Sequence, residues 1–444
     1  VRFNVYFGLF WLSFFSYPMA VAIVQFTGGW WTPYYLIGWV TGSVIVFAAT
    51  WQLYRRVDIL PIFSIVVTAI IFTGGVQLAL ETMTRDSDWF SHKEKLTIRK
   101  AGQLDINQDR LVTRFSEYRV TDRRNIYFFM PDGYPRTDAL AIANVMDNRP
   151  FEETLEGLGF VVPPKSMANT AYTEKSVSSV FSMRNLFDAD AKFLPKHTDS
   201  LIFNIDNGGW SVVHQLLKQS GYDIFVAGKN DKGNIVKCDG ACPIVDPKEK
   251  WAQRKTRLGV LRMTPIFAVL ERWFFGITTD LLQYQWRQEF DLSDGQINTM
   301  NSESPFLLFM HTMMTHEPFL FDENCNYLFN PDITQEMPPM MGKGAFEPFQ
   351  AGVVKCANKS FEAQVKRILA VDPNAVIIMQ SDHGMRRKEP GIFPKELNDL
   401  NWLGNFTALR MPRRCRGEIP DNFFNFDTFP VVLSCLGNMK VPTE

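Results

Sequence analysis

The strongest constraint on this sequence is its first 82 residues, which contain three long apolar stretches. The stretches cover residues 3–26, 33–53 and 60–80, and none of them contains a charged residue. About 20 apolar residues in a helix are enough to cross the ~30 Å hydrocarbon core of a bilayer. A signal peptide has a single apolar segment of only about 7–15 residues. Three stretches in series therefore predict a membrane anchor of three transmembrane helices at residues 1–82.

Positive charges beside these stretches predict on which side of the membrane the rest of the chain lies. Arg2 precedes the first stretch, and Arg55 and Arg56 lie between the second and the third. The loop between the first and second stretches carries no charge. Because arginine and lysine near spans are retained in the cytoplasm, these arginines are placed there. Everything after the third stretch is then expected outside the cytoplasm.

The cysteines favour the same location. All six follow the last apolar stretch, at Cys238, Cys242, Cys325, Cys356, Cys415 and Cys435. An even number of cysteines in such a region predicts disulfides in an oxidising compartment. Free buried thiols and a zinc knuckle are the alternatives, but zinc knuckles usually contain Cys-x2-Cys pairs, whereas three residues separate Cys238 from Cys242. We expect three disulfides, paired in sequential order.

Short apolar runs alternate with helical patterns after a charged connector at residues 83–120. Four runs have the length, composition and turn boundaries of buried strands: 125–130, 222–228, 305–311 and 375–380. Helical patterns at 208–221 and 357–371 lie between them. This alternation predicts an α/β domain over residues 121–444, with a mostly parallel central sheet and helices on both of its faces.

Polar side chains stand at or just beyond the ends of three of these runs. Asp132 follows the first, His311 ends the third and precedes His316, and Ser-Asp-His-Gly at 381–384 follows the fourth. Ligands of parallel α/β sheets bind at the carboxyl ends of the strands. An acid beside an imidazole there suits half of a metal site, although Asp-His alone is usually structural. Three of the six histidines fall in these two segments, which strengthens the metal interpretation.

A cluster of hydroxyl residues between the first two runs contains a candidate nucleophile. Thr173 and Ser176 come just before an apolar pattern that begins at Val177, so we expect them at the N-terminus of a helix. Backbone N–H groups and the helix dipole favour an anion at that position. An ordinary helix cap is the alternative interpretation of these hydroxyls.

Together these four elements resemble the alkaline phosphatase and sulfatase superfamily. More closely, they resemble its membrane-anchored phosphoethanolamine and phosphoglycerol transferases. The elements are a strand followed by Asp, Thr-x-x-Ser at a helix start, His-x4-His-x-Pro, and a strand followed by Ser-Asp-His-Gly. The resemblance covers roughly residues 122–440 and implies a sulfatase-like α/β/α domain.

The resemblance also implies a role for each matched residue. One divalent metal, with zinc favoured over manganese, would be bound by Asp132, Thr173, Asp382 and His383. Thr173 would also be the nucleophile, because a bound metal makes a hydroxyl more acidic. His311 and His316 match two histidines that face the substrate in the phosphoethanolamine branch, and they would transfer protons. A disulfide in that branch occupies the segment that Cys325 and Cys356 flank here.

The implied activity is the transfer of a phospholipid headgroup, with phosphatidylethanolamine or phosphatidylglycerol as donor and phosphoethanolamine favoured as the group moved. The acceptor would be a cell-envelope glycan or a lipid-linked sugar. The resemblance places the protein in the bacterial inner membrane, as a multi-pass protein with a periplasmic catalytic domain. The alternatives are a phosphoglycerol transferase, a sulfatase-like phosphodiesterase or hydrolase, and a catalytically inactive subunit of envelope assembly.

Several features narrow or limit this interpretation. Threonine cannot form the formylglycine of sulfatases, so sulfate-ester hydrolysis is disfavoured. No histidine follows His383 in the sequence, which favours a site with one metal over a site with two. Close phosphoethanolamine transferases usually have Glu where Asp132 stands and two cysteines around the nucleophile, so the headgroup stays open.

Basic residues expected near the motifs, and therefore near an anionic substrate, are Lys175, Arg386 and Arg387. The net charge of -1 argues against a general nucleic-acid binder.

Overall fold

In the part of the chain that the structure describes, seven strands form one sheet in the order β2-β8-β7-β1-β6-β4-β5. The structure is a computed structural model, and it describes residues 109–197, 211–227, 235–237, 292–300, 304–316, 319, 321–326, 346–387 and 397–442. The strands are β1 Ile126–Pro131, β2 Phe160–Val161, β4 Asp223–Ala227, β5 Ile235–Lys237, β6 Phe306–Thr312, β7 Val376–Gln380 and β8 Thr407–Arg410.

The four strands predicted from the sequence are present and form the centre of this sheet. Strand β1 pairs in parallel with both β6 and β7, and β6 pairs in parallel with β4. Strands β8 and β5, which flank this set, are antiparallel to β7 and β4 respectively. The predicted α/β architecture with a mostly parallel sheet is therefore confirmed. A separate pair, β3 Lys165–Met167 and β9 Asn422–Phe424, is also parallel.

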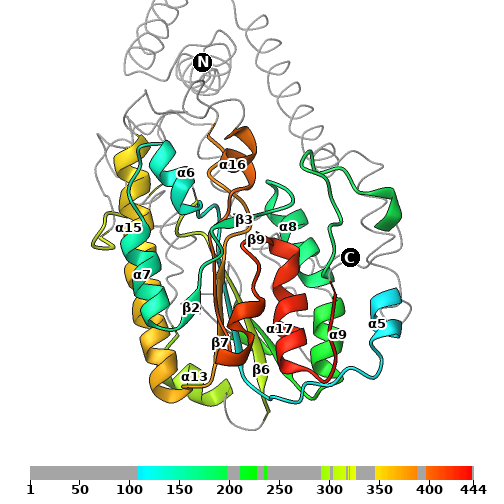
Figure 1. The fold of residues 1–444 in the computed structure, drawn as a ribbon. Helices are drawn as coiled ribbons and strands as arrows, with labels where there is room; N and C mark the ends of the chain where they lie inside the picture. The colour runs from blue at the N-terminus through cyan, green and yellow to red at the C-terminus, as the bar shows by residue number, and fades with distance from the viewer. Residues whose placement is uncertain are drawn as a thin grey trace, which may run out of the picture. The chain divides into compact units, whose positions relative to one another are not determined.

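Helices cover both faces of the sheet. Successive side chains of β1 point to opposite faces, so each face has an apolar core that the helices cover. Phe128 and Met130 belong to one core, and Tyr127 and Phe129 belong to the other. The first core includes residues of α5 Arg110–Arg114, α8 Thr173–Ser182, α9 Val212–Lys218 and α17 Thr428–Leu436. The second includes residues of α6 Thr137–Ile142, α7 Arg149–Gly157, α13 Asp294–Met300 and α15 Phe346–Val371. Figure 1 shows α7 and α15 on one side of the sheet and α8, α9 and α17 on the other.

The predicted helices lie where the sequence places them, with different boundaries. The segment 208–221 contains α9, and the segment 357–371 is the second half of α15, which begins at Phe346. Only the last part of the predicted connector is described, and it contains α5. The Asp109 side chain caps α5 by accepting a hydrogen bond from the Leu111 N–H group at 2.8 Å.

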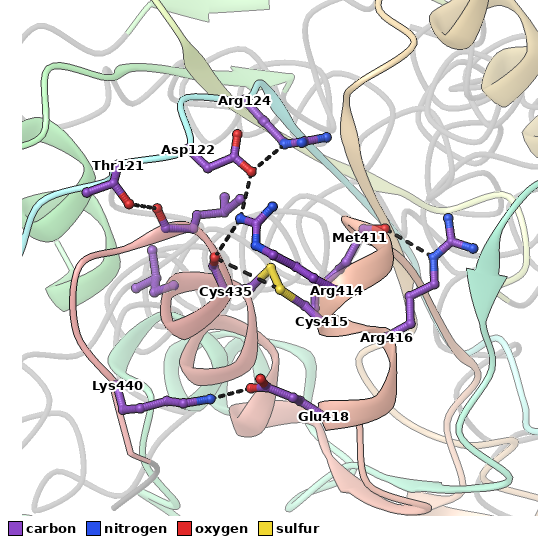
Figure 2. Close-up of a disulfide and its surroundings, with 12 residues drawn as sticks. Thr121, Asp122, Arg124, Met411, Arg414, Cys415, Arg416, Glu418, Cys435 and Lys440 are labelled. Carbon is purple, nitrogen blue, oxygen red and sulfur yellow. Dashed lines mark hydrogen bonds and ion pairs between the residues drawn. A yellow bond between two sulfur atoms is a disulfide. The ribbon is translucent and has the colours of Figure 1, made fainter.

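Two of the three predicted disulfides are present with the predicted sequential pairing. Cys325 is bonded to Cys356, and Cys415 is bonded to Cys435. The first joins the segment after β6 to α15. The second joins the 3-10 helix η4 Arg413–Glu418 to α17, as Figure 2 shows. The third predicted pair, Cys238 with Cys242, lies outside the described residues.

The predicted anchor at residues 1–82 also lies outside the described residues. Among the helices of the described segments, none combines the length and the apolar character needed to cross a bilayer.

Candidate active site

Asp132 is fixed at the carboxyl end of β1. Its backbone N–H group donates to the Thr312 carbonyl oxygen at 2.8 Å, which extends the pairing of β1 with β6 by one residue. The side chain is only 2% exposed. The chain then turns at Gly133, where φ is 68° and an added Cβ would approach His383 Cε1 to 3.2 Å. The positive φ and the close approach both require glycine beside this carboxylate.

The loop after β7 brings Asp382 and His383 to the same edge of the sheet. Asp382 Oδ1 accepts hydrogen bonds from the backbone N–H groups of Gly133 at 2.9 Å and His383 at 3.0 Å. Ser381 Oγ accepts from the Tyr134 N–H group at 2.8 Å and donates to the His383 carbonyl oxygen at 2.9 Å. These bonds tie the loop after β7 to the loop after β1, so the two acidic side chains have fixed relative positions.

Three of the predicted ligands converge in one buried group. The ligand atoms of Asp132, Asp382 and His383 all lie within 4.8 Å of one another, a grouping that could hold a metal ion. His383 Nε2 lies 3.4 Å from Asp132 Oδ1 and 3.4 Å from Asp382 Oδ2. We call these three side chains the metal group.

The donor atoms of the metal group fit a divalent cation. Asp132 Oδ1 and Asp382 Oδ2 are buried and have no hydrogen-bond partner within the described segments, although buried carboxylate oxygens normally have one. His383 Nδ1 lies 2.8 Å from the Gly384 carbonyl oxygen, which can only accept, so the other ring nitrogen, Nε2, is turned toward the carboxylates. Metal-binding histidines are commonly oriented in this way. Two carboxylates and an imidazole suit zinc or manganese.

Thr173 lies beside the metal group at the start of α8. It is the first residue of the helix, whereas the N-cap residue is Tyr172, which makes no side-chain capping bond. Thr173 Oγ1 instead donates to Asp132 Oδ2 at 3.4 Å. The ordinary-cap interpretation of Thr173 is therefore wrong, because its hydroxyl contacts a carboxylate of another element.

Ser176 holds the start of α8 against the loop after β7. Its Oγ donates to the Asp382 carbonyl oxygen at 2.6 Å and accepts from Asn425 Nδ2 at 2.7 Å. The sequence analysis did not identify Asn425, because nothing local marks it and it lies 249 residues from Ser176.

Both predicted histidines of the His-x4-His segment face Asp132. His311 Nε2 lies 3.3 Å from Asp132 Oδ2, and His316 Nε2 lies 3.9 Å from Asp132 Oδ1. The His311 side chain is 3% exposed and the His316 side chain is 36% exposed. His316 therefore approaches the carboxylate from the solvent side.

The electrostatics of the metal group reflect this crowding of imidazoles around a carboxylate. Burial by itself raises the pKa of Asp132, but the charge of His316 and the nearby His311 and His383 rings outweigh it and hold the pKa well below its usual range. Burial lowers the pKa of His383, but the Asp382 and Asp132 carboxylates outweigh it, so the pKa is raised. A metal binds neutral imidazole, so its binding would release a proton from His383.

One of the three basic residues expected near the motifs faces the metal group. Arg386 Nη1 lies 3.3 Å from His383 Nε2, and its guanidinium carbon lies 5.9 Å from the centre of the Tyr172 ring. Lys175 instead donates to a backbone carbonyl oxygen at 2.6 Å, and Arg387 pairs with a glutamate at 3.1 Å. Arg386 is therefore the basic side chain placed to meet an anion at this site.

Comparisons with known proteins give matches among solved structures. No family model and no curated protein matches the chain. The integral membrane lipooligosaccharide phosphoethanolamine transferase A, EptA, from Neisseria meningitidis is 13% identical, with a TM-score of 0.46 over 91% of this chain and 75% of that chain. The C-terminal periplasmic domain of EptC from Escherichia coli is 13% identical, with a TM-score of 0.43 over 72% of this chain and 84% of that chain.

The lipoteichoic acid synthase LtaP from Listeria monocytogenes is a third similar structure. It is 11% identical, with a TM-score of 0.39 over 78% of each chain. Identities and TM-scores this low do not transfer an activity, so the function proposed below rests on the site itself. Phosphoethanolamine transferases, the branch that the sequence motifs resemble, are thus among the solved structures to which this chain is similar.

Proposed function

We propose that the protein is a metal-dependent transferase that moves a phospholipid headgroup, through a phosphothreonine, to a cell-envelope glycan or lipid-linked sugar. One observation carries this proposal. A threonine hydroxyl at a helix N-terminus lies 3.4 Å from a carboxylate of a buried Asp-Asp-His group, and one oxygen of each carboxylate has no hydrogen-bond partner among the described residues. A nucleophile held beside such a group is the arrangement that phosphoryl transfer to a side chain requires.

Asp132, Asp382 and His383 would hold the metal, with the Thr173 oxygen as a further ligand. When bound, a divalent metal makes the threonine hydroxyl more acidic and neutralises charge on the phosphate oxygens. Zinc is favoured, with manganese as the alternative, and a single ion accounts for the donors that converge here.

In the first half-reaction, Thr173 Oγ1 attacks the phosphorus of the lipid headgroup. A bond forms between this oxygen and phosphorus, and the bond from phosphorus to the diacylglycerol oxygen breaks. The threonine proton passes to an imidazole beside Asp132, and the departing diacylglycerol oxygen takes up a proton. His316 suits this exchange because its ring is partly exposed, while buried His311 orients the carboxylate.

In the second half-reaction, a hydroxyl of the acceptor attacks the phosphothreonine. Its proton passes to the same imidazole, the bond from Thr173 Oγ1 to phosphorus breaks, and the threonine regains a proton. The headgroup phosphate is then attached to the acceptor and the enzyme is regenerated. Arg386 and the N-terminus of α8 would stabilise negative charge on the phosphate oxygens in both steps.

The proposed arrangement of the chain follows from the sequence. Residues 1–82 would anchor the protein in the bacterial inner membrane, residues 83–120 would connect, and residues 121–444 would form the periplasmic catalytic domain. The anchor would keep Thr173 close to its lipid donor. The disulfides Cys325–Cys356 and Cys415–Cys435 support an oxidising compartment for this domain.

Mass spectrometry of the peptide that contains Thr173 would test the proposal. The purified chain would be incubated with zinc and vesicles of phosphatidylethanolamine or of phosphatidylglycerol, without an acceptor. We expect a phosphoethanolamine adduct on Thr173 from the first vesicles. A phosphoglycerol adduct from the second would identify the runner-up activity. Thr154→Ala, which changes a half-buried threonine of α7 outside the site, should be labelled like the wild type, whereas Thr173→Ala should not.

Two outcomes would contradict the proposal. Release of free headgroup phosphate at a rate that added glycan does not change would indicate a phosphodiesterase that uses water. If Thr173 stayed unmodified with both lipids and no diacylglycerol appeared, the covalent mechanism would be wrong, and an inactive envelope-assembly subunit would be favoured.

A further inference from the structure

A cavity of about 350 Å³ is lined by five arginines at the opposite end of the sheet from the metal group. They are Arg124, Arg410, Arg413, Arg414 and Arg416, and we call this cavity the arginine pocket. Arg124 precedes β1 and Asp132 follows it, so the six residues of the strand, about 20 Å at ~3.3 Å per residue, separate the two sites. The arginine pocket is therefore distinct from the candidate active site.

Positive charge in the arginine pocket is only partly balanced. Within the described residues, one carboxylate contacts the five guanidinium groups: Asp122 Oδ2 accepts from Arg124 Nε at 2.9 Å and from Arg414 Nη2 at 2.7 Å. Arg410 donates to three backbone carbonyl oxygens, at 2.7, 3.0 and 3.2 Å. Asp122 and Asp372, whose charge acts on Arg410, offset two of the five positive charges and leave an excess of three around the cavity.

The guanidinium groups are also close enough to repel one another. Burial lowers the pKa of Arg410, and the charges of Arg416 and Arg124 lower it further. An anion in the cavity would relieve this repulsion.

Local structure holds the side chains of Arg124, Arg410, Arg414 and Arg416 in place before any ligand arrives. Arg413, Arg414 and Arg416 all belong to η4, which the Cys415–Cys435 disulfide ties to α17. Figure 2 shows Arg124 and Arg414 meeting at Asp122, with Arg416 on the same short helix as the disulfide. Arg416 Nε donates to the Met411 carbonyl oxygen at 3.2 Å. Guanidinium groups fixed in this way lose little conformational entropy on binding.

We propose that the arginine pocket binds an anion that carries two or more closely spaced phosphate groups, as a phosphorylated envelope saccharide would present. Guanidinium groups match phosphate oxygens with paired hydrogen bonds, and several around one cavity select for more than one phosphate. A membrane surface fits less well, because none of the exposed large apolar side chains of the described segments lines the cavity. This site does not depend on the proposed transferase activity.

Isothermal titration calorimetry with inorganic pyrophosphate would test this site on the full chain, with the metal removed by a chelator. We expect pyrophosphate to bind wild-type protein more tightly than inorganic phosphate does. The double substitution Arg413→Gln and Arg416→Gln should weaken pyrophosphate binding at least tenfold and reduce its dependence on salt. A matched control, Arg149→Gln with Lys192→Gln, removes two charges from exposed ion pairs elsewhere and should leave the affinity unchanged.

Further variants keep the test decisive if the double substitution unfolds the protein. The Arg413 side chain is exposed and makes no hydrogen bond or ion pair within the described segments, so Arg413→Gln alone should fold and still weaken binding about threefold or more. Equal affinity in wild type and Arg413→Gln would overturn the proposal. Loss of pyrophosphate binding in Asp382→Asn would also overturn it, because the pyrophosphate would then be bound at the metal group. Binding only to phosphatidylglycerol vesicles, and not to pyrophosphate, would instead indicate a membrane contact.

Discussion

At the scale of single residues, the site depends on two buried carboxylates, each with one oxygen that lacks a hydrogen-bond partner within the described residues. Asp132 Oδ1 and Asp382 Oδ2 have no hydrogen-bond partner within the described residues. Leaving a buried polar group unpaired costs about 1–3 kcal/mol, and more for a charged group. A ligand such as a metal would supply the missing interaction, so the cost of burying these oxygens and the affinity for a metal would have the same origin.

The first prediction concerns metal content. Asp382→Asn removes one charged donor from the metal group, so we expect zinc affinity to fall at least 100-fold and turnover to fall with it. Elemental analysis of purified protein would measure bound zinc against protein concentration. Asp138→Asn, which changes a carboxylate paired with Arg136 outside the metal group, is the matched control and should keep wild-type zinc. Wild-type zinc content in Asp382→Asn would exclude it as a ligand.

The second prediction separates Arg386 from the metal ligands. Arg386→Gln removes the guanidinium that lies 3.3 Å from His383 Nε2. We expect turnover to fall about 10- to 100-fold, because charge that develops on the phosphate oxygens loses a stabilising cation, while zinc content stays the same. Steady-state kinetics together with elemental analysis would check this. A loss of zinc in Arg386→Gln would show that the arginine only supports the metal group.

At the scale of secondary-structure elements, a buried ion pair connects the start of α5 to the segment after α8. Arg184 donates to Asp109 at 2.7 and 2.8 Å, and the two side chains are 3% and 1% exposed. Asp109 also caps α5. This ion pair thus fixes both the N-terminus of α5 and the position of α5 relative to the segment after α8.

The third prediction follows from this pair. Arg184→Met leaves the Asp109 carboxylate buried without its charged partner, so we expect the free energy of unfolding to fall by about 3–5 kcal/mol. Denaturant unfolding of the single variants and of Arg184→Met with Asp109→Asn would form a double-mutant cycle. The double variant should lose less than the sum of the single variants, and strict additivity would show that the two side chains are not coupled. Arg149→Met, which breaks an exposed pair, should have little effect.

The fourth prediction concerns the N-terminus of α9, where His214 completes a capping box with Ser211 and stacks on Phe181. Burial first, and then the charge of Lys218, lowers the pKa of His214 from 6.5 to about 3. Between these values the unfolded chain binds a proton that the folded chain does not. The contribution of this residue to stability is therefore complete above pH 6.5 and declines toward pH 3, by up to about 1.4 kcal/mol per pH unit.

Replacing His214 with Gln tests this dependence, because glutamine can keep the capping box but does not titrate. Denaturant midpoints measured from pH 7 to pH 4 should fall more steeply for the wild type than for His214→Gln. Parallel curves would show that His214 binds its proton equally well in the folded and the unfolded chain.

How far the sequence predicts these elements depends on where each element lies in the sheet. The four central strands are recognisable because parallel strands covered on both faces form continuous apolar runs, and β1, β6 and β7 are buried at every residue. The outer strands β2, β5 and β8 have only two to four residues each. These strands are too short to show a pattern in the sequence. They form because neighbouring strands in the sheet pair with them, and no local sequence encodes this pairing.

The candidate site shows the same limit. The residues Asp132, Thr173, Asp382 and His383 stand out because they occupy fixed places relative to strand ends and a helix start. Asn425 belongs to no such pattern and reaches the site only through the folding of the chain. The predicted roles of the site residues remain proposals, which the experiments above test.

At the scale of the whole molecule, the disulfides link segments that the sheet alone does not hold together. The Cys325–Cys356 bond closes a separation of 31 residues, and the Cys415–Cys435 bond closes a separation of 20 residues. In the chain-entropy account, a disulfide stabilises mainly by restricting the unfolded chain, and longer loops gain more.

The fifth prediction is the size of this effect. Replacing Cys415 and Cys435 by Ala should lower the free energy of unfolding by about 3 kcal/mol, the chain-entropy value for a loop of this length. Unfolding measured with and without a thiol reductant would separate the two bonds. Reductant should destabilise the wild type more than the double variant, which retains Cys325–Cys356. Equal sensitivity would show that Cys415 and Cys435 are not bonded in the purified protein.

Because Cys415 lies in η4, the Cys415–Cys435 bond links the arginine pocket to the compartment in which the protein is oxidised. Three of the five arginines of the arginine pocket are carried by this short helix, so their arrangement depends on an oxidation that cytosolic thiols prevent. A newly made chain inside the cell is surrounded by nucleotides and RNA, which are abundant polyphosphates. With the proposed periplasmic location, we expect the reduced chain to hold these competitors weakly and to acquire the proposed phosphate affinity only after export, when oxidation closes the bond.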